Sequence, residues 1–556
     1  MLVLDLMNEK LKIGLLLENE DINNHIKELI EWASNEHEIE ITHYLIAKNT
    51  PDTQNSKIKK LFSLSFIKKY LNNYFKKIIM RYEEKRNLSH SRNHSNKSRK
   101  YKITEFEINK FIYNAEFSKN GISVTIDEES LKKLKELNLD VLLRFNKRIL
   151  KGEILNLNKF GILSLHLGDD MKYRGGPSGF WEVYNKEHNS GFIIQQLTEN
   201  LDNGNLLFRG KISTEKTWLL NRAELNLRSY FYLKQTLKEL ATNRELPKFL
   251  KNIPYTDKVY RNPTNYQLIK YILMRIQNKL NDLNFNNKSN RYQVGFQKNT
   301  WGNLEYRKSI FIENKEGTFN ADPFVIEKDN KSYCFVECFD YSEKKAKINV
   351  YELSEKEYTF IGTALEESFH LSFPYIFEFN NDIYMIPESS KNRDIRLYKC
   401  NNFPLEWNLE EVLINDIDAA DTMILRKDNK WWMMTNEDPL KLNNHNYQMN
   451  IYYSDNLLNG KWISHKNNPI IMDSNKARNA GLVFDEDSIF RVSQAFGFYK
   501  KYGENFSLNK IEFLDTNNYS EKTFSTHTKF FNKSILGSHH LHSNNIFSVF
   551  DIWKKT

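Results

Sequence analysis

The pattern of apolar and polar positions divides the chain into two parts. Up to about residue 290, continuous apolar runs alternate with segments whose apolar residues recur every three or four positions. Ile13–Leu17 (IGLLL) predicts a strand buried on both faces, and residues 22–33 follow it at helical spacing, with Asp21 as the expected N-cap. Residues 39–46 alternate as a second strand. Strand, helix and strand in this order predict the opening of a parallel α/β sheet, without a GxGxxG dinucleotide motif.

The same reasoning extends this part to about residue 290. Strands are expected over 122–126 and 139–145, with Asp127 capping the helix between them. A long amphipathic helix is expected over 217–240 and another over 266–280, separated by a proline-containing linker. We therefore predict an α/β domain over 1–240, a linker and helix over 241–290, and a second domain over 291–556.

After about Gly295, helical periodicity gives way to short alternating strands rich in tyrosine, phenylalanine, tryptophan and isoleucine. A strand–polar turn–strand unit recurs at Ala321, Ser372, Ala420, Arg478 and, in degenerate form, Ser538. A period of roughly 50 residues is typical of one four-stranded blade per repeat, so this part predicts an all-β five-bladed propeller. Asp322, Asp421 and Asn479 begin their repeats at what are expected to be equivalent places facing a central funnel.

Candidate chemistry in the first part gathers in residues 161–207. An apolar strand over 162–165 leads to His166, a turn follows at Arg174-Gly175-Gly176-Pro177, and a second strand over 192–197 leads to Asp202. A histidine at a strand end with a carboxylate beyond the next strand can form a general base and its orienting partner. The alternatives are a hydrogen-bonded structural histidine and an Asx turn at Asp202.

Composition and charge exclude several classes of function. The 556 residues carry a net charge of +9, which is mild for this size and does not indicate a nucleic-acid-binding protein. Three cysteines favour a reducing compartment without structural disulfides, and we expect no membrane span, no secretory signal and a cytoplasmic protein. The basic segment 85–102 is either an anion-binding arm or a solvated loop, and its histidines have no partners at metal-ligand spacing.

The run SLHLGDDMKYRGGPSGFWEVYNKEHNSGFIIQQLTENLDNGNLL resembles the formyltransferases that use 10-formyltetrahydrofolate. Their pattern is Asn-x-His at a strand end, a Tyr-Arg-Gly turn and a Leu-Asp-x-Gly. The resemblance implies a Rossmann-like formyltransferase domain in which His166 and Asp202 handle protons while an amine attacks the formyl carbon. It further implies cofactor-binding positions, which are Arg144, Phe145, Arg174, Gly175 and Gly176.

One position departs from this pattern. The family's asparagine, which donates to the developing oxyanion, is replaced by Ser164, whose hydroxyl can donate but reaches less far. The departure leaves open transfer of another acyl group or loss of activity. No segment resembles the small barrel that methionyl-tRNA formyltransferases add for tRNA, so the resemblance favours a nucleotide-linked amino sugar as acceptor, in polysaccharide biosynthesis.

The repeats after Gly295 resemble the propeller at the N-terminus of glucosamine inositolphosphorylceramide transferases, and more distantly the five-bladed propellers of glycoside hydrolases. The resemblance implies carboxylates in the funnel, for which Asp322, Glu388 and Asp421 are the candidates. His370 and one of Trp431 and Trp432 are candidates to line a sugar site. The alternative is that the acidic residues end strands or cap turns.

Three functional hypotheses follow. The first is folate-dependent formyl transfer to an amino sugar, with the propeller binding the glycan. The second is transfer of a glycosyl or other group, and the third is a non-catalytic glycan-binding protein. No metal site is predicted, and the pattern does not indicate the oligomeric state.

Overall fold

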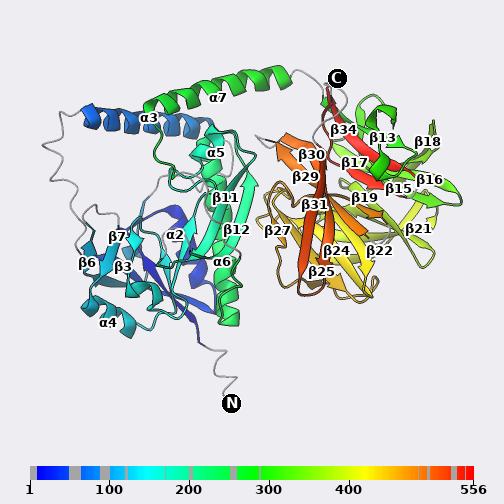
Figure 1. Ribbon diagram of the computed structural model, residues 1–556. Helices are drawn as coiled ribbons and strands as arrows, with labels where there is room; N and C mark the ends of the chain where they lie inside the picture. Colours follow the sequence, from blue (N-terminus) through cyan, green and yellow to red (C-terminus); the bar gives the residue numbers. More distant parts are fainter. Residues whose placement is uncertain are drawn as a thin grey trace, which may run out of the picture. The chain divides into compact units, whose positions relative to one another are not determined.

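The computed structural model describes residues 9–48, 64–87, 100–118, 123–168, 171–199, 204–250, 259–286, 290–485, 488–497, 501–527, 535–544 and 546–555. The chain forms two compact units, Met1–Asn278 and Lys279–Thr556. Figure 1 shows the first with helices and strands and the second as almost entirely β-structure.

The first unit is built on a seven-stranded sheet in the order β12-β11-β10-β8-β1-β3-β5. Its strands are β1 (Leu11–Leu16), β3 (Ile39–Ala47), β5 (Asn109–Tyr113), β8 (Val141–Arg144), β10 (Ile162–His166), β11 (Asn189–Gln196) and β12 (Asn205–Ser213). β10, β8, β1, β3 and β5 run parallel, whereas β11 pairs antiparallel with β10 and β12 pairs antiparallel with β11. The predicted parallel α/β opening is therefore confirmed.

Small strands flank this sheet: β2 (Asp21–Ile22), β4 (Tyr101–Lys102), β6 (Ala115–Phe117), β7 (Ser123–Ile126) and β9 (Ile149–Leu150). The helices of the unit are α2 (Asn24–Ser34), α3 (Leu64–Asn87), α4 (Glu128–Glu136), α5 (Phe180–Tyr184), α6 (Trp218–Asn243) and α7 (Asn265–Asn286), which continues past Asn278. Asp127 caps α4, as predicted. Asp21 does not cap α2, because it lies in β2 and the side chain of Asn23 accepts the hydrogen bond from the Ile26 amide instead.

Two layers of helices bury the sheet. Leu131 and Leu134 of α4 join Leu16, Leu142 and Ile162 in one apolar cluster. α2 and α6 contact each other, and both contact the sheet strands. Both faces of the central strands are thus covered, which explains why β1 reads as a continuous apolar run.

The second unit consists of four-stranded antiparallel groups. The first three are β15 (Thr318–Lys328), β16 (Lys331–Asp340), β17 (Lys345–Leu353) and β18 (Tyr358–Leu365); β19 (Ser372–Phe379), β20 (Asp382–Glu388), β21 (Asp394–Asn402) and β22 (Glu406–Asn415); and β23 (Ala419–Lys427), β24 (Lys430–Glu437), β25 (Gln448–Ser454) and β26 (Ile463–Ser464), with β27 (Ile471–Met472).

The remaining strands join in one nine-stranded sheet. It contains β28 (Asn479–Asp485), β29 (Ser488–Gly497), β30 (Lys501–Leu514) and β31 (Tyr519–His527), followed by β32 (Ile535–Gly537), β33 (Leu541–Ser543), β34 (Ser548–Lys555), β13 (Asn290–Gln297) and β14 (Ile310–Phe311). β13 pairs with β34 along its whole length, so the beginning and the end of the unit close in one sheet.

The first strands of the groups form a closed series of contacts. β15 contacts β19, β19 contacts β23, β23 contacts β28, β28 contacts β33, and β33 contacts β15. These strands begin the five sequence repeats, so each predicted strand–turn–strand unit forms as a hairpin. The apolar core lies between neighbouring groups.

Candidate functional site

In the first unit, the predicted residues gather at the carboxyl end of β10. Alternation places Ser164 and His166 on the same face of this strand. A Cβ on Gly168 would lie 3.1 Å from Nε2 of His166 and 2.5 Å from the carbonyl oxygen of Tyr173. The imidazole and the turn that begins at Tyr173 therefore both lie close to Gly168.

The turn itself is held by a segment that the sequence pattern marked as a linker. The amide of Tyr260 donates to the carbonyl of Arg174, and the amide of Gly176 donates to the carbonyl of Tyr260, at 2.8 and 3.1 Å. Gly175 has φ 95°, and a Cβ there would lie 2.1 Å from the carbonyl oxygen of Tyr260, so only glycine fits. Trp181 donates through Nε1 to the Gly176 carbonyl.

A small, shallow pocket that is open to solvent lies against this turn. Besides the turn residues 174–179, it is lined by Leu167, Tyr173, Trp181, Glu182 and Tyr260. It combines aromatic rings with backbone amides, as sites for flat ring systems do. Gly176 faces open space, since no heavy atom lies within 4 Å of where its Cβ would be.

The other residues predicted for this site are placed as follows. Arg144 donates to Asn146 and to the carbonyl of Arg148, and burial lowers the pKa of its guanidinium. Phe145 stacks on Tyr230 with ring centroids 6.2 Å apart. Asp202 lies outside the described residues; Gly204, two positions on, packs against the Gln195 side chain, and the backbone of Gln195 pairs with that of Ser164.

In the second unit, an irregularity recurs at the start of each of the first four groups. The pairing register shifts between Ala321 and Phe324 in β15, and at the corresponding points of β19, β23 and β28. Asp322 and Asp421 occupy the same place in this bulge, with φ of 48° in both. Asn479 aligns one residue earlier, so the prediction that it is equivalent to them is wrong. Bulges re-aim side chains, and positive φ in non-glycine residues is strained, which is typical of functional positions.

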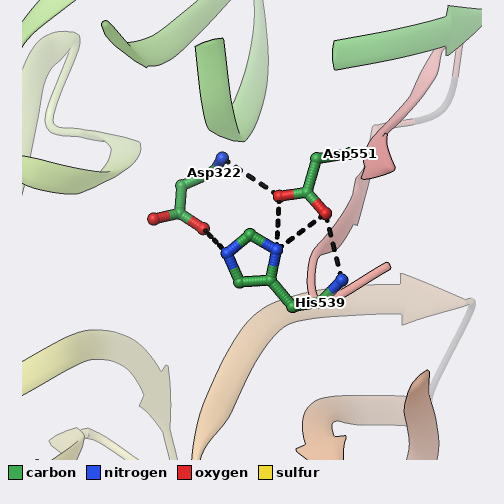
Figure 2. Close-up of side chains that lie close together, drawn as sticks. All are labelled: Asp322, His539 and Asp551. Carbon is green, nitrogen blue, oxygen red and sulfur yellow. Dashed lines mark hydrogen bonds and ion pairs between the residues drawn. The ribbon is translucent and has the colours of Figure 1, made fainter. Parts of the chain in front are cut away.

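Asp322 lies beside a buried imidazole. Nε2 of His539 is 3.2 Å from Oδ1 of Asp322, and Nδ1 of His539 is 2.8 Å from Asp551, so the ring lies between two carboxylates (Figure 2). Burial lowers the pKa of His539, but the two aspartates outweigh it and raise the pKa to about 10. Burial raises the pKa of Asp322, but His539, His540 and Arg478 outweigh it and lower it to about 2. Asp322 is therefore an ionised carboxylate at neutral pH.

Three more carboxyl groups complete what we call the acidic centre: Glu337, Glu388 and Asp421. Arg478 donates through Nε to Asp421 at 2.6 Å, and its Nη2 lies 4.0 Å from Glu388. Burial, together with Glu388 and Asp322, raises the pKa of Asp421 to about 7 against the effect of Arg478. Burial and the neighbouring Asp322 and Glu388 also hold the pKa of Glu337 well above its ordinary value.

The acidic centre thus contains groups in different protonation states. Asp322 is ionised, while burial and the neighbouring carboxylates favour the protonated form of Glu337. Carboxyl groups whose environments push their pKa values apart can divide the roles of base and acid between them. His370 lies beside Glu337, with Nε2 3.7 Å from Oε1, so it borders the acidic centre. Both Trp431 and Trp432 are buried, and neither lines an open sugar site.

Donor atoms of Asp322, His539 and Asp551 lie within 4.8 Å of one another, which is close enough for a shared metal ion. Both ring nitrogens of His539 face carboxylates, however, and its raised pKa favours the imidazolium. A cation would have to displace that proton. The arrangement therefore suits a buried ion pair better than a metal centre.

Sequence reasoning missed Glu337, Arg478, His539 and Asp551. Two of these residues, Glu337 and His539, could have been found by aligning the repeats with one another. Glu337 pairs with Ala321 as Glu388 pairs with Ser372, so these glutamates are equivalent in consecutive repeats. His539 occupies in the fifth repeat the place that Asp322 holds in the first, because Ser538-His539-His540-Leu541 aligns with Ala321-Asp322-Pro323-Phe324. Arg478 and Asp551 had no such signal.

A family match lies within the second unit. Residues 308–546 match the family described as glucosamine inositolphosphorylceramide transferase 1, N-terminal. Glucosamine inositolphosphorylceramide transferase 1 of Oryza sativa subsp. japonica is 36% identical over 208 residues, which are 36% of this chain and 27% of that protein.

Formyltransferases are the second group of relatives. Methionyl-tRNA formyltransferase of Caldanaerobacter subterraneus subsp. tengcongensis is 32% identical over 129 residues, 22% of this chain and 41% of that protein. GDP-perosamine N-formyltransferase of Brucella melitensis is 35% identical over 71 residues, 13% of this chain and 27% of that protein. The chain thus spans less than half the length of each of these relatives, all of which are named as transferases.

Solved structures show only distant likeness. The catalytic domain of a GH62 α-L-arabinofuranosidase from Coprinopsis cinerea has a TM-score of 0.33 at 10% identity, covering 48% of this chain and 98% of that chain. A formyltetrahydrofolate deformylase from Pseudomonas syringae pv. tomato has a TM-score of 0.26 at 12% identity, covering 43% and 62%. Values this low do not establish a shared fold. Within the described residues, no helix has the length and apolar character needed to cross a membrane.

Proposed function

We propose that this chain is a transferase that moves a formyl group from 10-formyltetrahydrofolate to the amine of a nucleotide-linked amino sugar, in the assembly of a polysaccharide. The observation that carries the proposal is the close contact of His166, Gly168 and the turn at Tyr173–Gly176 beside an open pocket. Relatives of both groups add support, because glucosamine and perosamine, which appear in their names, are amino sugars.

The described residues fit the reacting end of such a cofactor. Aromatic rings and the exposed glycine backbone at Gly176 border the shallow pocket, which encloses far less space than a folate needs, so a flat ring would lie on its open side. When bound, the cofactor would supply a formyl group activated for attack by an amine. Arg174, Gly175 and Gly176 are the residues proposed to hold it; Arg144 and Phe145, engaged by their own neighbours, would shape the adjoining wall.

His166 would take the proton that the amine loses as its nitrogen forms the new bond to carbon. A neutral imidazole can do so at physiological pH. The Ser164 hydroxyl, on the same strand face, would donate to the oxygen on which negative charge develops. Asp202 is proposed to orient the imidazole, as in the family that this segment resembles.

A formylation assay tests this proposal. Purified protein is incubated with 10-formyltetrahydrofolate and a panel of nucleotide-linked amino sugars, and formamide products are measured by mass spectrometry. We expect at least one product, with a rate that His166→Ala lowers by about 10²- to 10⁴-fold. No product with any sugar, together with no folate binding by calorimetry, would refute formyl transfer.

A second function is favoured by the acidic centre. We propose that the closed series of strand groups is a five-bladed propeller whose centre binds a glycan or transfers a glycosyl group. The ionised Asp322 and Glu337, whose pKa is raised, could serve as base and acid at an anomeric carbon, as in sugar-processing sites with paired carboxyl groups. Loss of glycan turnover in Asp322→Asn, with glycan binding retained, would support a catalytic role of this site. Unchanged turnover would exclude that role.

A further inference from the structure

Two helices of the first unit expose a row of large apolar side chains. On α3 these are 42–58% exposed and on α7 they are 47–74% exposed. They recur three or four positions apart, so each set forms one stripe along its helix. The residues are Leu71, Tyr74, Ile78 and Tyr82 on α3, and Tyr266, Ile269, Leu273 and Ile276 on α7. We call them the α3–α7 face.

Other faces of the same helices attach them to the unit. Ile79 of α3 packs with Leu268 and Tyr271 of α7 in one buried cluster. Glu83 is buried, and it accepts hydrogen bonds from the Tyr271 hydroxyl and from the amide of Leu219 at the start of α6. Both helices therefore already have an apolar side in the core. The exposed stripes are a second apolar side that the core does not use.

The helices of the α3–α7 face are also rich in basic residues. α3 and residues 265–278 of α7 contain nine lysines and arginines and two acidic residues, in a chain of net charge +9. One of the two acidic residues is the buried Glu83. Lys77, Arg81 and Lys85 of α3 and Lys270 of α7 are exposed on these helices. Apolar stripes accompanied by basic side chains match a surface that is apolar beneath and anionic on top.

We propose that the α3–α7 face lies on an anionic lipid surface. Helices with leucine, isoleucine and tyrosine on one side and lysine and arginine beside them bind at the boundary between headgroups and acyl chains. A second copy of the chain is a poorer occupant, because a two-fold interface sets the same patch against itself and would bring the basic residues of both copies together. Neither helix is apolar enough to cross the membrane, so the contact is peripheral.

Vesicle flotation of the full chain tests the proposal. Vesicles of phosphatidylcholine alone are compared with vesicles that also contain phosphatidylglycerol, at low and high salt. We expect binding to the anionic vesicles only, weakened by salt. Ile78→Ser/Leu273→Ser and Lys77→Glu/Arg81→Glu should each lower the bound fraction about tenfold or more. Phe513→Ser, at a 63% exposed phenylalanine of the second unit, is the matched control and should bind like the wild type.

Other outcomes would overturn the proposal. One is absence of binding to anionic vesicles, with light scattering showing a dimer that Ile78→Ser/Leu273→Ser dissociates; the occupant would then be a second copy. Another is equal binding of the wild type and both double variants. Circular dichroism of each variant must match the wild type, so that a loss of binding cannot come from unfolding of α3 or α7.

Discussion

The two candidate sites of this chain are built in opposite ways. The site of the first unit lies at the end of β10, and its residues come mostly from one continuous stretch, between Ser164 and Gly176. The acidic centre of the second unit takes Asp322, Glu388, Arg478 and His539 from positions spread over more than 200 residues. One is an open edge with a pocket, and the other is a buried cluster of charges.

This difference decides what holds each site in place. Backbone hydrogen bonds and glycines shape the turn beside His166, so its geometry depends on close backbone approach. The acidic centre depends on charge balance, since its carboxyl groups are buried around His539 and Arg478. Buried charges that lose a partner are far more costly than a changed turn. The two sites should therefore fail differently when altered.

The largest effect on stability is expected for His539→Ala. Removing the imidazolium leaves Asp322 and Asp551 buried without their counter-charge, so the free energy of unfolding should fall by about 3–5 kcal/mol. Urea unfolding at pH 7 measures it, with the exposed His37→Ala as control. A loss below about 1 kcal/mol would show that the ion pair is not what holds the acidic centre.

This ion pair also predicts a pH dependence. The pKa of His539 rises from 6.5 in the unfolded chain to about 10, so its contribution is complete below pH 6.5 and disappears as the pH rises towards 10. The pKa of Asp322 falls from 3.8 to about 2, so its contribution is complete above pH 3.8 and disappears as the pH falls towards 2. The free energy of unfolding of the wild type should therefore exceed that of His539→Ala by the largest amount between about pH 4 and 6.5.

In the first unit, Ser164→Ala should lower formylation about 100-fold, because it removes the donor proposed for the developing negative charge. The expected signature is a fall in kcat with little change in KM, since the interaction strengthens only in the transition state. Ser164→Asn, which restores the amide of the family that this stretch resembles, should retain or raise the rate. Equal rates for Ser164→Ala and the wild type would exclude this role.

Substitutions at two glycines distinguish an effect on the geometry of the turn from an effect on the space available to a ligand. Gly168→Ala places a Cβ 2.5 Å from the Tyr173 carbonyl oxygen, so the turn must shift, at a cost of about 1–3 kcal/mol. Gly176→Ala meets no heavy atom within 4 Å and should leave the thermal midpoint nearly unchanged. If the pocket holds the cofactor, Gly176→Ala should nevertheless weaken folate binding in calorimetry.

Glu337→Gln is expected to stabilise the fold, in contrast to the substitutions above. The pKa of Glu337 is raised in the folded chain, so its proton stabilises the fold below about pH 4.5, and this contribution is lost as the pH rises. Glutamine imitates the protonated group at every pH. The variant should therefore gain about 1.4 kcal/mol over the wild type for each pH unit above 4.5, until the folded-state pKa is reached. Urea unfolding at several pH values would show a flat difference if Glu337 is ionised in the fold.

Local patterns predicted much of the first unit. The continuous run at β1, the alternation in β3 and the cap at Asp127 gave the strand and helix order, because each reflects burial or hydrogen bonding within a few residues. His166 and the Tyr173–Gly176 turn were found for the same reason. Tyr260 was missed because its contribution is a backbone pairing with a distant turn, which leaves no mark on side-chain pattern.

Asp322, Glu388 and Asp421 of the acidic centre were candidates from the sequence, through the resemblance of the repeats to glycoside hydrolase propellers. Asp322 and Asp421 begin repeats and share one bulge, so their equivalence is visible in the sequence. Asn479 was misplaced by one residue, because bulges shift the register without changing the apolar pattern. His539 and Asp551 meet Asp322 only through closure of the first and last strand groups, a long-range contact that no local pattern encodes.

The most direct test of the account is a parallel measurement of formamide production by the wild type, His166→Ala and Asp322→Asn, at saturating 10-formyltetrahydrofolate and amino sugar. The account predicts that His166→Ala loses at least about 100-fold in kcat, while Asp322→Asn keeps a kcat close to that of the wild type. Equal production by His166→Ala and the wild type, or loss of production in Asp322→Asn alone, would contradict it and place the transfer reaction elsewhere in the chain.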